Sequence, residues 1–278
     1  MSNRPHAASD VAYTLHHYGE SPSQFLELVL PSLEHGEQPS GVAVVIHGGY
    51  WRATYGADLG LPLAADLAQH GWVAANLEYR RIDGDDPEDA GGWPATFEDV
   101  AAGIDALADL LPESYRELPV YAVGHSAGGH LAVWAAHRSE FDAGAVGAEP
   151  RVRLAGVVSQ AGLLDLHLAH EMQLSDDAAG RLMGSTPVDA PEDWHHADPA
   201  RLAPAPVDVV VLHPEADEDV PAAVAHSYCE AAAGAGASPR FRPVPGDHLA
   251  LIDPESRAWK LTLRELARLA GLEEAERD

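Results

Sequence analysis

The sequence predicts an α/β fold in which a mostly parallel central sheet is covered by helices on both faces. Short apolar runs rich in Val alternate with longer Ala- and Leu-rich segments of helical spacing, an order typical of a parallel sheet wrapped by helices. The runs are apolar almost throughout, which indicates burial on both faces. With 278 residues, 46% of them hydrophobic, the chain can bury one large core.

Seven segments have the composition of strands. They lie at residues 24–31, 41–48, 71–80, 118–125, 152–160, 207–213 and 239–245. Helices are expected at residues 57–70, 94–111, 126–138, 221–234 and 254–270. Proline stands near the first turn of three of these helices, where its missing N–H costs nothing. We expect a single domain over residues 18–278, preceded by a flexible tail over residues 1–17.

Residues 161–205, the cap segment, interrupt this alternation. The segment is rich in Asp, His, Pro and Gly and contains one amphipathic stretch, LHLAHEMQLSDDAAGRLMG. We interpret it as a small excursion over one end of the sheet rather than as a second domain. Its apolar underside would consist of Leu166, Leu168, Met172 and Leu174.

Charge and cysteine content exclude several classes of protein. The 17 basic and 44 acidic residues give a net charge of -27, which repels phosphate backbones and anionic lipids. No nucleic acid or membrane partner is therefore expected, and no stretch reaches membrane-spanning length. The first twenty residues lack the apolar core of a signal peptide, so we expect a cytoplasmic protein. Cys229 is the only cysteine, which excludes an intrachain disulfide.

A glycine-rich joint lies where the strand at 118–125 meets the helix at 126–138. The residues Gly124-His125-Ser126-Ala127-Gly128-Gly129 fit the G-x-S-x-G pattern of a nucleophile elbow. A sharp turn from strand to helix strains the turning residue and needs neighbours without a Cβ. It would hold the Ser126 hydroxyl at a helix N-terminus, which stabilises negative charge. The alternative is a glycine-rich turn in which Ser126 only caps the helix.

A serine nucleophile needs a base and a third group that orients the base. Asp217 follows the strand that ends at His213, and His248 lies in a turn between the last strand and the last helix. The order Ser126, Asp217, His248 places each residue at a carboxyl end of a strand, as a nucleophile-elbow fold requires. Asp219, in the same loop, is the alternative acid.

The remaining histidines are expected to have structural roles, because most histidines are packing or surface residues. His125 should point away from Ser126, and His130 and His137 lie farther along the same helix. The pair His195-His196 near Asp198 is a weak indication of a metal site, since no further ligand has suitable spacing. We therefore predict no metal and no cofactor.

The stretch VAVVIHGGYW supplies a second glycine-rich loop. The oxyanion of acyl transfer needs backbone N–H groups that are fixed before the reaction. Gly48 and Gly49 would let the chain bend so that amides of this loop face the amide of Ala127. Tyr50 and Trp51 follow directly, and they would either wall the substrate pocket or pack in the core.

The sequence resembles the α/β-hydrolase superfamily and, within it, the esterases and kynurenine formamidases (arylformamidases) that carry an H-G-G-x-W oxyanion loop. Residues 47–51, HGGYW, match every fixed position. The resemblance extends from about residue 18 to 259. It includes NLEYRR, the following GGWPATFEDVAAGIDAL, and the acid loop HPEADEDVP, in which Pro214 replaces the usual glycine.

This resemblance implies roles for individual residues. Ser126 would be the nucleophile, His248 the base and Asp217 its orienting acid. The backbone N–H groups of Gly48, Gly49, Tyr50 and Ala127 would form the oxyanion hole.

These features predict a serine hydrolase that cleaves small carboxylic esters or aryl formamides through an acyl-enzyme on Ser126. Kynurenine formamidase proper is an alternative, because Tyr50, Trp51 and Arg52 would provide aromatic walls and a cation for a substrate carboxylate. Ion pairs explain the arginine equally well in so acidic a chain. A non-catalytic binding protein on this fold is the alternative from another class. Nothing in the sequence specifies an oligomeric state.

Overall fold

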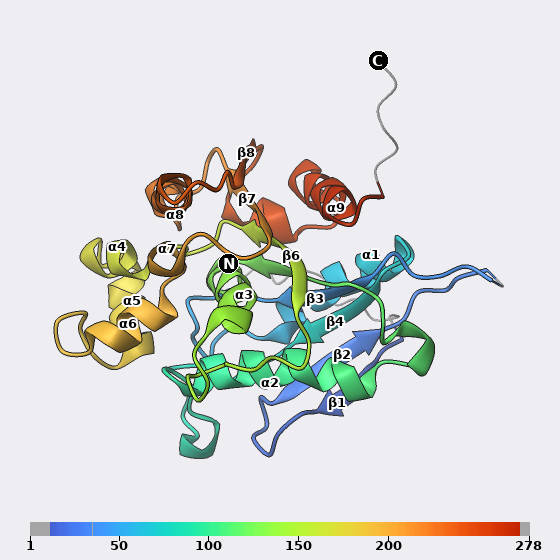
Figure 1. Cartoon of the computed structure of the whole chain (residues 1–278), viewed down its shortest axis with the longest axis horizontal. Helices are drawn as coiled ribbons and strands as arrows, with labels where there is room; N and C mark the ends of the chain where they lie inside the picture. Colours follow the sequence, from blue (N-terminus) through green and yellow to red (C-terminus); the bar gives the residue numbers. More distant parts are fainter. Residues whose placement is uncertain (1–11, 35, 273–278) are drawn as a thin grey trace, which may run out of the picture.

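A single mixed sheet organises the molecule, whose computed structural model describes residues 12–34 and 36–272 (Figure 1). The eight strands run in the order β1-β2-β4-β3-β5-β6-β7-β8. The β1–β2 and β2–β4 pairs are antiparallel, and the five remaining pairs are parallel. The strands are β1 (Thr14–His17), β2 (Phe25–Val29), β3 (Val42–Ile46), β4 (Val73–Leu77), β5 (Val120–His125), β6 (Leu154–Gln160), β7 (Asp208–Pro214) and β8 (Arg240–Val244).

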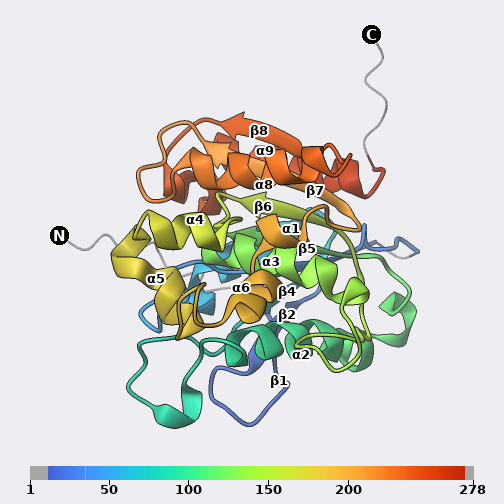
Figure 2. The ribbon, with the colours of Figure 1, turned by 60° about the vertical axis from the view of Figure 1, so that its left-hand side comes forward.

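Helices cover both faces of the sheet, so the fold is the predicted α/β arrangement (Figure 2). The α-helices are α1 (Leu61–Gln69), α2 (Ala95–Leu110), α3 (Ala127–His137), α4 (Leu166–Glu171), α5 (Leu174–Met183), α6 (Pro191–Ala197), α7 (Pro199–Leu202), α8 (Ala222–Gly234) and α9 (Arg257–Leu269). Short 3₁₀ turns are η1 (Ala57–Leu59), η2 (Pro87–Asp89), η3 (Glu113–Tyr115), η4 (Arg138–Glu140) and η5 (His248–Ile252). Within residues 12–34 and 36–272, no helix has both the length and the apolar character needed to cross a membrane.

Two hydrophobic cores lie on opposite faces of the sheet. Alternate residues of β3 point to opposite sides, so Val44 joins the larger core and Val45 the smaller one. The larger core contains residues of α2, α3 and α8, and the smaller one contains residues of α1 and α9. Burial on both faces explains why the strands read as continuous apolar runs.

The predicted flexible tail over residues 1–17 extends too far, because its last residues belong to the sheet. Thr14–His17 form β1, which pairs with β2 from Thr14↔Leu28 to His17↔Phe25. Both faces of this short strand are largely solvent-exposed, and Leu15 is 52% exposed. The strand therefore lacks the pattern of apolar residues by which the other strands are predicted. The rest of the predicted tail, up to residue 11, lies outside the described residues.

The cap segment connects two strands that are neighbours in the sheet, β6 and β7. It contains α4, α5, α6 and α7, which gather at one end of the sheet (Figures 1 and 2). Leu166 and Trp194 are completely buried and belong to the larger core, whereas Met172 is exposed. The expected apolar underside is therefore split between the core and the solvent.

Helix α3 approaches the sheet so closely that two positions have no room for a side chain. A Cβ on Gly124 would lie 2.1 Å from the carbonyl oxygen of Gly128. A Cβ on Gly128 would lie 2.0 Å from the carbonyl oxygen of Ile46 and 2.5 Å from that of His47. All three oxygens belong to the backbone, which cannot rotate away as a side chain can.

We expect Gly128→Ala to lower the free energy of unfolding by at least about 1–3 kcal/mol, because the added methyl group overpacks a backbone contact. Gly234→Ala is the matched control, since Gly234 also lies in a helix and a Cβ there meets no atom within 4 Å. The control should be neutral or stabilising by up to about 1 kcal/mol. Urea unfolding measures both variants, and equal effects would contradict the close contact.

Candidate active site

Ser126 occupies the sharp turn between β5 and α3. Its backbone lies in an unusual region, at φ 53° and ψ −118°, where a non-glycine residue persists only if the surroundings hold it. The Ser126 N–H donates to Gln160 O at 2.8 Å, and the Ser126 carbonyl accepts from Gly129 N at 2.9 Å. The side chain makes no capping hydrogen bond to α3. The alternative that Ser126 merely caps the helix is therefore wrong.

The oxyanion loop, residues 47–51, runs directly beside Ser126. A Cβ on Gly48 would lie 2.8 Å from the Ser126 Cβ. The loop turns through three consecutive left-handed residues, Gly49 (φ 108°), Tyr50 (φ 50°) and Trp51 (φ 56°). An Arg52 N–H to Gly49 O bond of 3.0 Å closes the turn.

Several backbone donors of this region are not used by the fold. In the described part of the chain, the N–H groups of Gly48, Gly49, Tyr50 and Ala127 donate to no protein acceptor. Ala127 is the first residue of α3, so its N–H cannot have a partner within the helix. Free donors beside a serine hydroxyl are the chemistry that stabilises an oxyanion.

His248 and Asp217 are in direct contact. His248 begins η5, after β8, and its Nδ1 lies 2.8 Å from Asp217 Oδ2. The other carboxylate oxygen accepts the backbone N–H groups of Asp219, at 2.9 Å, and Val220, at 2.8 Å. Burial would raise the pKa of Asp217, but the hydrogen bonds from His248 and Val220 outweigh it and lower that pKa. An ionised Asp217 fixes the proton of His248 on Nδ1.

The two atoms through which Ser126 and His248 would exchange a proton make no hydrogen bond within the protein. Neither Ser126 Oγ nor His248 Nε2 has a hydrogen-bond partner among the described residues. Such bonds often form only when substrate is bound. The arrangement can therefore accept a proton on His248 Nε2 while Asp217 stabilises the resulting charge.

Asp219, the alternative acid, makes its hydrogen bonds through its backbone, although its carboxylate lies within 4.8 Å of ligand atoms of Asp217 and His248. Its carbonyl accepts the Tyr50 hydroxyl at 2.6 Å, which ties the oxyanion loop to the acid loop, residues 213–221. Burial, followed by the charges of Asp219 and Asp217, raises the pKa of Tyr50 to about 12. Tyr50 thus stays protonated and can donate this bond.

His125 was expected to be a packing residue, but the structure places it against His248. Its Nε2 donates to the His248 carbonyl at 3.0 Å, and the two ring centroids are 4.5 Å apart. Burial and then the charge of His248 lower the pKa of His125 to about 3, so the ring is neutral. The sequence contains no local signal for this contact, because 123 positions separate the two residues. His130 and His137, which lie on α3, are buried, in keeping with the packing roles expected for them.

A further histidine, His213, also faces the acid. Its Nε2 lies 3.8 Å from Asp217 Oδ2, and within the described residues neither ring nitrogen has a hydrogen-bond partner. Burial lowers the pKa of His213, so the neutral ring does not compete with His248 for the carboxylate charge.

Two predicted pocket residues have other positions. Trp51 is 0% exposed and packs edge-on against His130 in the larger core, at a centroid distance of 5.2 Å. The prediction of Trp51 as a pocket wall is therefore wrong. The Arg52 guanidinium donates to the Ser175 carbonyl and lies 3.6 Å from the Asp83 carboxylate. These contacts match the ion-pair explanation of Arg52 and link the oxyanion loop to the cap segment.

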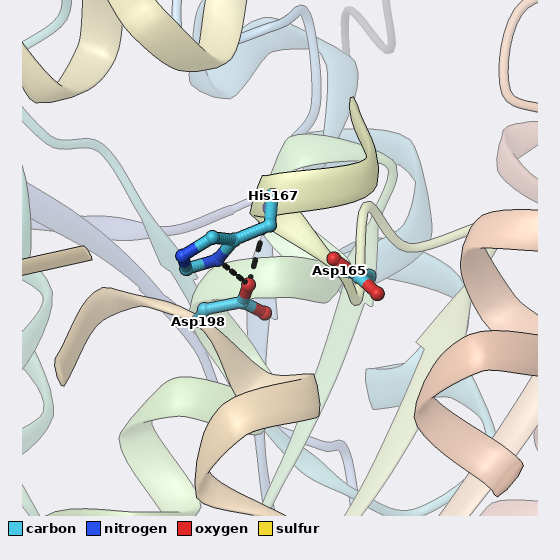
Figure 3. A group of neighbouring side chains, drawn as sticks. All are labelled: Asp165, His167 and Asp198. Carbon is cyan, nitrogen blue, oxygen red and sulfur yellow. Dashed lines mark hydrogen bonds and ion pairs between the residues drawn. The ribbon is translucent and has the colours of Figure 1, made fainter. Parts of the chain in front are cut away.

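The cap segment contains a cluster of Asp165, His167 and Asp198 (Figure 3). His167 Nδ1 lies 2.6 Å from Asp198 Oδ2. Asp165 accepts the Leu168 N–H at the start of α4, and Asp198 accepts the Ala200 N–H at the start of α7. Since both carboxylates cap helices, we interpret the cluster as a structural network rather than as a metal site.

A hollow in the described residues lies away from this site. It has a volume of about 390 Å³ and is lined by Asp208, Tyr228, Arg240 and Arg268, among others. Asp208 and Arg240 begin β7 and β8, whereas Ser126 follows the end of β5. The hollow is therefore at the opposite edge of the parallel strands.

Comparison with known proteins relates this geometry to a family. The BD-FAE family model matches residues 26–231, whereas no curated protein matches the sequence. Similar solved structures include esterase B from Lactobacillus rhamnosis, with a TM-score of 0.77, 18% identity, and coverage of 96% of this chain and 87% of that one. A truncated carbohydrate esterase from gut microbiota has a TM-score of 0.75, 19% identity, and coverage of 95% and 99%.

Esterase 2 from Thermogutta terrifontis has a TM-score of 0.72 and 17% identity, and the alignment covers 96% of this chain and 95% of that one. At such identities the similarity concerns the fold. The family match, by contrast, covers more than half of the chain. The chain belongs to the BD-FAE family, an esterase-type family of hydrolases with the α/β-hydrolase fold.

Proposed function

We propose that this esterase-family chain is a serine hydrolase that cleaves small carboxylic esters through an acyl-enzyme on Ser126. One observation carries the proposal. Gly48 lies against the Ser126 side chain, the backbone N–H groups of residues 48–50 and 127 are unused by the fold, and the His248–Asp217 pair follows β7 and β8 of the same parallel strands. A nucleophile, a base with its orienting acid and an oxyanion hole are together the requirements of acyl transfer.

The reaction has two halves. Ser126 Oγ attacks the ester carbon while His248 Nε2 takes the hydroxyl proton, and the N–H groups of residues 48–50 and 127 bind the oxyanion. When this tetrahedral intermediate collapses, the bond between the carbonyl carbon and the leaving oxygen breaks, and the leaving oxygen receives the proton from His248. Water then attacks the acyl-enzyme while His248 takes a proton from the water. Collapse of this second tetrahedral intermediate releases the carboxylic acid, and His248 returns the proton to Ser126. Asp217 remains ionised throughout.

The surroundings of Ser126 favour a small acyl group. Ser126 is only 2% exposed, and the Tyr50–Asp219 hydrogen bond joins the oxyanion loop to the acid loop beside it. Trp51 fills the core instead of lining an open groove. Leu249, which follows His248, is 60% exposed, and we propose that it gives the leaving group an apolar surface. Aryl formamides undergo the same steps with an amine as leaving group.

N-formylkynurenine is the more specific formamide substrate to compare. The cation expected for its carboxylate is Arg52, whose guanidinium already contacts Asp83 and Ser175. Small esters are therefore the substrate class that we propose first, and the same panel of substrates tests both.

We expect Ser126→Ala to lower kcat for p-nitrophenyl acetate by roughly 10⁴ to 10⁶, because the covalent nucleophile is lost. Circular dichroism should show an unchanged fold. A fluorophosphonate should label the wild-type protein at Ser126 and leave the variant unlabelled. Near-normal turnover in the variant, or a label on another serine, would show that the elbow is not the reactive centre.

We expect Asp217→Asn to lower kcat by roughly 10³ to 10⁴, since the amide favours the wrong tautomer of His248. Asp219→Asn is the matched control two residues away. It should change kcat by less than about threefold, because the His248 ring is hydrogen-bonded to Asp217 and the Asp219 carboxylate makes no hydrogen bond to it. The measurement is kcat of both variants with the same ester. A larger loss in Asp219→Asn than in Asp217→Asn would identify Asp219 as the acid that orients His248.

We expect kcat/KM to be highest for acetyl to butyryl esters and to fall once the acyl chain exceeds about six carbons. Methylenes outside the site gain none of the roughly 0.8 kcal/mol that burial of each would provide. The assay uses p-nitrophenyl esters of about two to twelve carbons, with N-formylkynurenine and an acetylated sugar beside them. A steady rise toward twelve carbons would indicate a long groove, and a dominant rate on N-formylkynurenine would establish the formamidase.

A further inference from the structure

We propose that His47 is a buried, doubly protonated imidazolium that, held by Glu78, positions the Gly48–Gly49 peptide of the oxyanion hole. His47 is thus a positioning residue, and Glu78 is its counter-ion. The inference rests on the proposed function, because it concerns the same reaction.

Both ring nitrogens of His47 contact atoms that only accept hydrogen bonds. Nε2 lies 2.8 Å from Glu78 Oε1, and Nδ1 lies 2.8 Å from the carbonyl oxygen of Gly48. A carbonyl oxygen has no proton to give, and neither does an ionised carboxylate. A neutral imidazole has one donor nitrogen and would satisfy only one of these contacts. Both nitrogens therefore carry a proton, and the ring is charged.

Glu78 is placed to be ionised although it is buried. Its Oε1 accepts the Tyr79 N–H at 2.9 Å, its Oε2 accepts the Ala57 N–H at 2.8 Å, and Arg81 lies 3.3 Å from Oε2. Burial would raise the pKa of Glu78, but the His47 contact, the Arg81 charge and the Tyr79 N–H lower it below its ordinary value. Both oxygens also accept a backbone N–H and Arg81 lies beside Oε2, so independently of His47 the carboxylate is placed to accept rather than to donate.

The other neighbours of His47 are compatible with a cation. Its ring stacks on Tyr79 with centroids 4.5 Å apart and an interplanar angle of 10°, a contact that an aromatic face makes favourably with a positive charge. The Tyr79 hydroxyl also donates to the His47 carbonyl at 2.8 Å. His125, the titratable group that faces His47 from β5, is neutral because its pKa is lowered to about 3. No second charged histidine opposes the imidazolium there.

The charge acts on one peptide of the oxyanion loop. Across a trans peptide the C=O and the N–H point in opposite directions, so fixing the Gly48 carbonyl on His47 turns the Gly49 N–H away from His47. Glycine on both sides would otherwise let this peptide rotate freely, and Gly49 already has φ 108°. A hydrogen bond from a cation also polarises the peptide and strengthens its N–H as a donor.

The protonation state can be measured directly on the resting protein. Long-range ¹H–¹⁵N spectra distinguish an imidazolium from either neutral tautomer, and His47→Gln identifies the signal by its loss. We expect two protonated ring nitrogens on His47 in the resting protein, because both nitrogens contact atoms that only accept hydrogen bonds. A single protonated nitrogen at neutral pH would overturn the proposal. This result does not depend on turnover, and it can be obtained with the Ser126→Ala variant.

The kinetic test uses Glu78→Gln, which keeps the shape but removes the counter-charge. We expect kcat for p-nitrophenyl acetate to fall roughly 10- to 100-fold while KM changes by less than about twofold. The Ki of a trifluoromethyl ketone should rise by the same factor by which kcat falls. The ketone is the sharper probe, because its adduct with Ser126 places an oxyanion in the hole. A purely structural defect lowers the amount of active protein without weakening the ketone for the molecules that remain.

Asp105→Asn is the matched control, because Asp105 forms a comparable ion pair with Arg138 at 2.6 Å on α2, outside the site. It should lower stability while kcat and the ketone Ki stay unchanged. Unchanged kcat and Ki in Glu78→Gln would overturn the positioning role. If Ser126→Ala instead retains turnover, the proposed function fails, and the nitrogen spectra still decide the charge of His47.

Discussion

The close contact between the start of α3 and the ends of β3 and β5 is the constraint on which the site depends. Gly128 approaches the carbonyl oxygens of Ile46 and His47, and Gly124 approaches Gly128. Because these contacts join backbone to backbone, α3 must begin immediately after β5, which forces Ser126 to φ 53°. The same approach brings the unpaired N–H of Ala127 next to the oxyanion loop. One packing constraint therefore positions both the proposed nucleophile and part of its proposed oxyanion hole.

Most of the sheet could be predicted from the sequence, because a strand that is buried on both faces consists largely of apolar residues. The strands from β2 to β7 are largely apolar and buried, whereas β8, with the sequence RFRPV, is mostly exposed at the edge of the sheet. The strand β1 could not be predicted, since it is held by its ladder to β2 and not by burial. Trp51 was misplaced for a different reason. Whether a residue after two glycines turns to solvent or to the core depends on the left-handed turn at residues 49–51, which no short pattern specifies.

In the candidate site, too, some residues could be predicted from local sequence patterns, whereas others are identified only by their tertiary contacts. The serine elbow and the H-G-G-x-W loop are local patterns, so the positions of their residues follow from spacing. The contacts of His125 with His248 and of His47 with Glu78 join residues 123 and 31 positions apart. With sixteen histidines in the chain, only tertiary structure shows which of them share a hydrogen bond with the catalytic loops. Residue identity thus indicates the chemistry, whereas the network that orients it is a property of the fold.

Charge is arranged in opposite senses at the surface and in the site. The chain carries a net charge of -27, while the region beside Ser126 places Arg81 and His47 around a single Glu78 carboxylate. A neutral ester approaches such a protein without electrostatic penalty. Hydrolysis then converts it into a carboxylic acid, which ionises in water and is repelled by the acidic surface. In the proposed reaction, the positive charge of His47 would stabilise the short-lived oxyanion, and the overall negative charge would disfavour rebinding of the anionic product. In this proposal, the local and the overall charge act at different steps of one reaction and do not oppose each other.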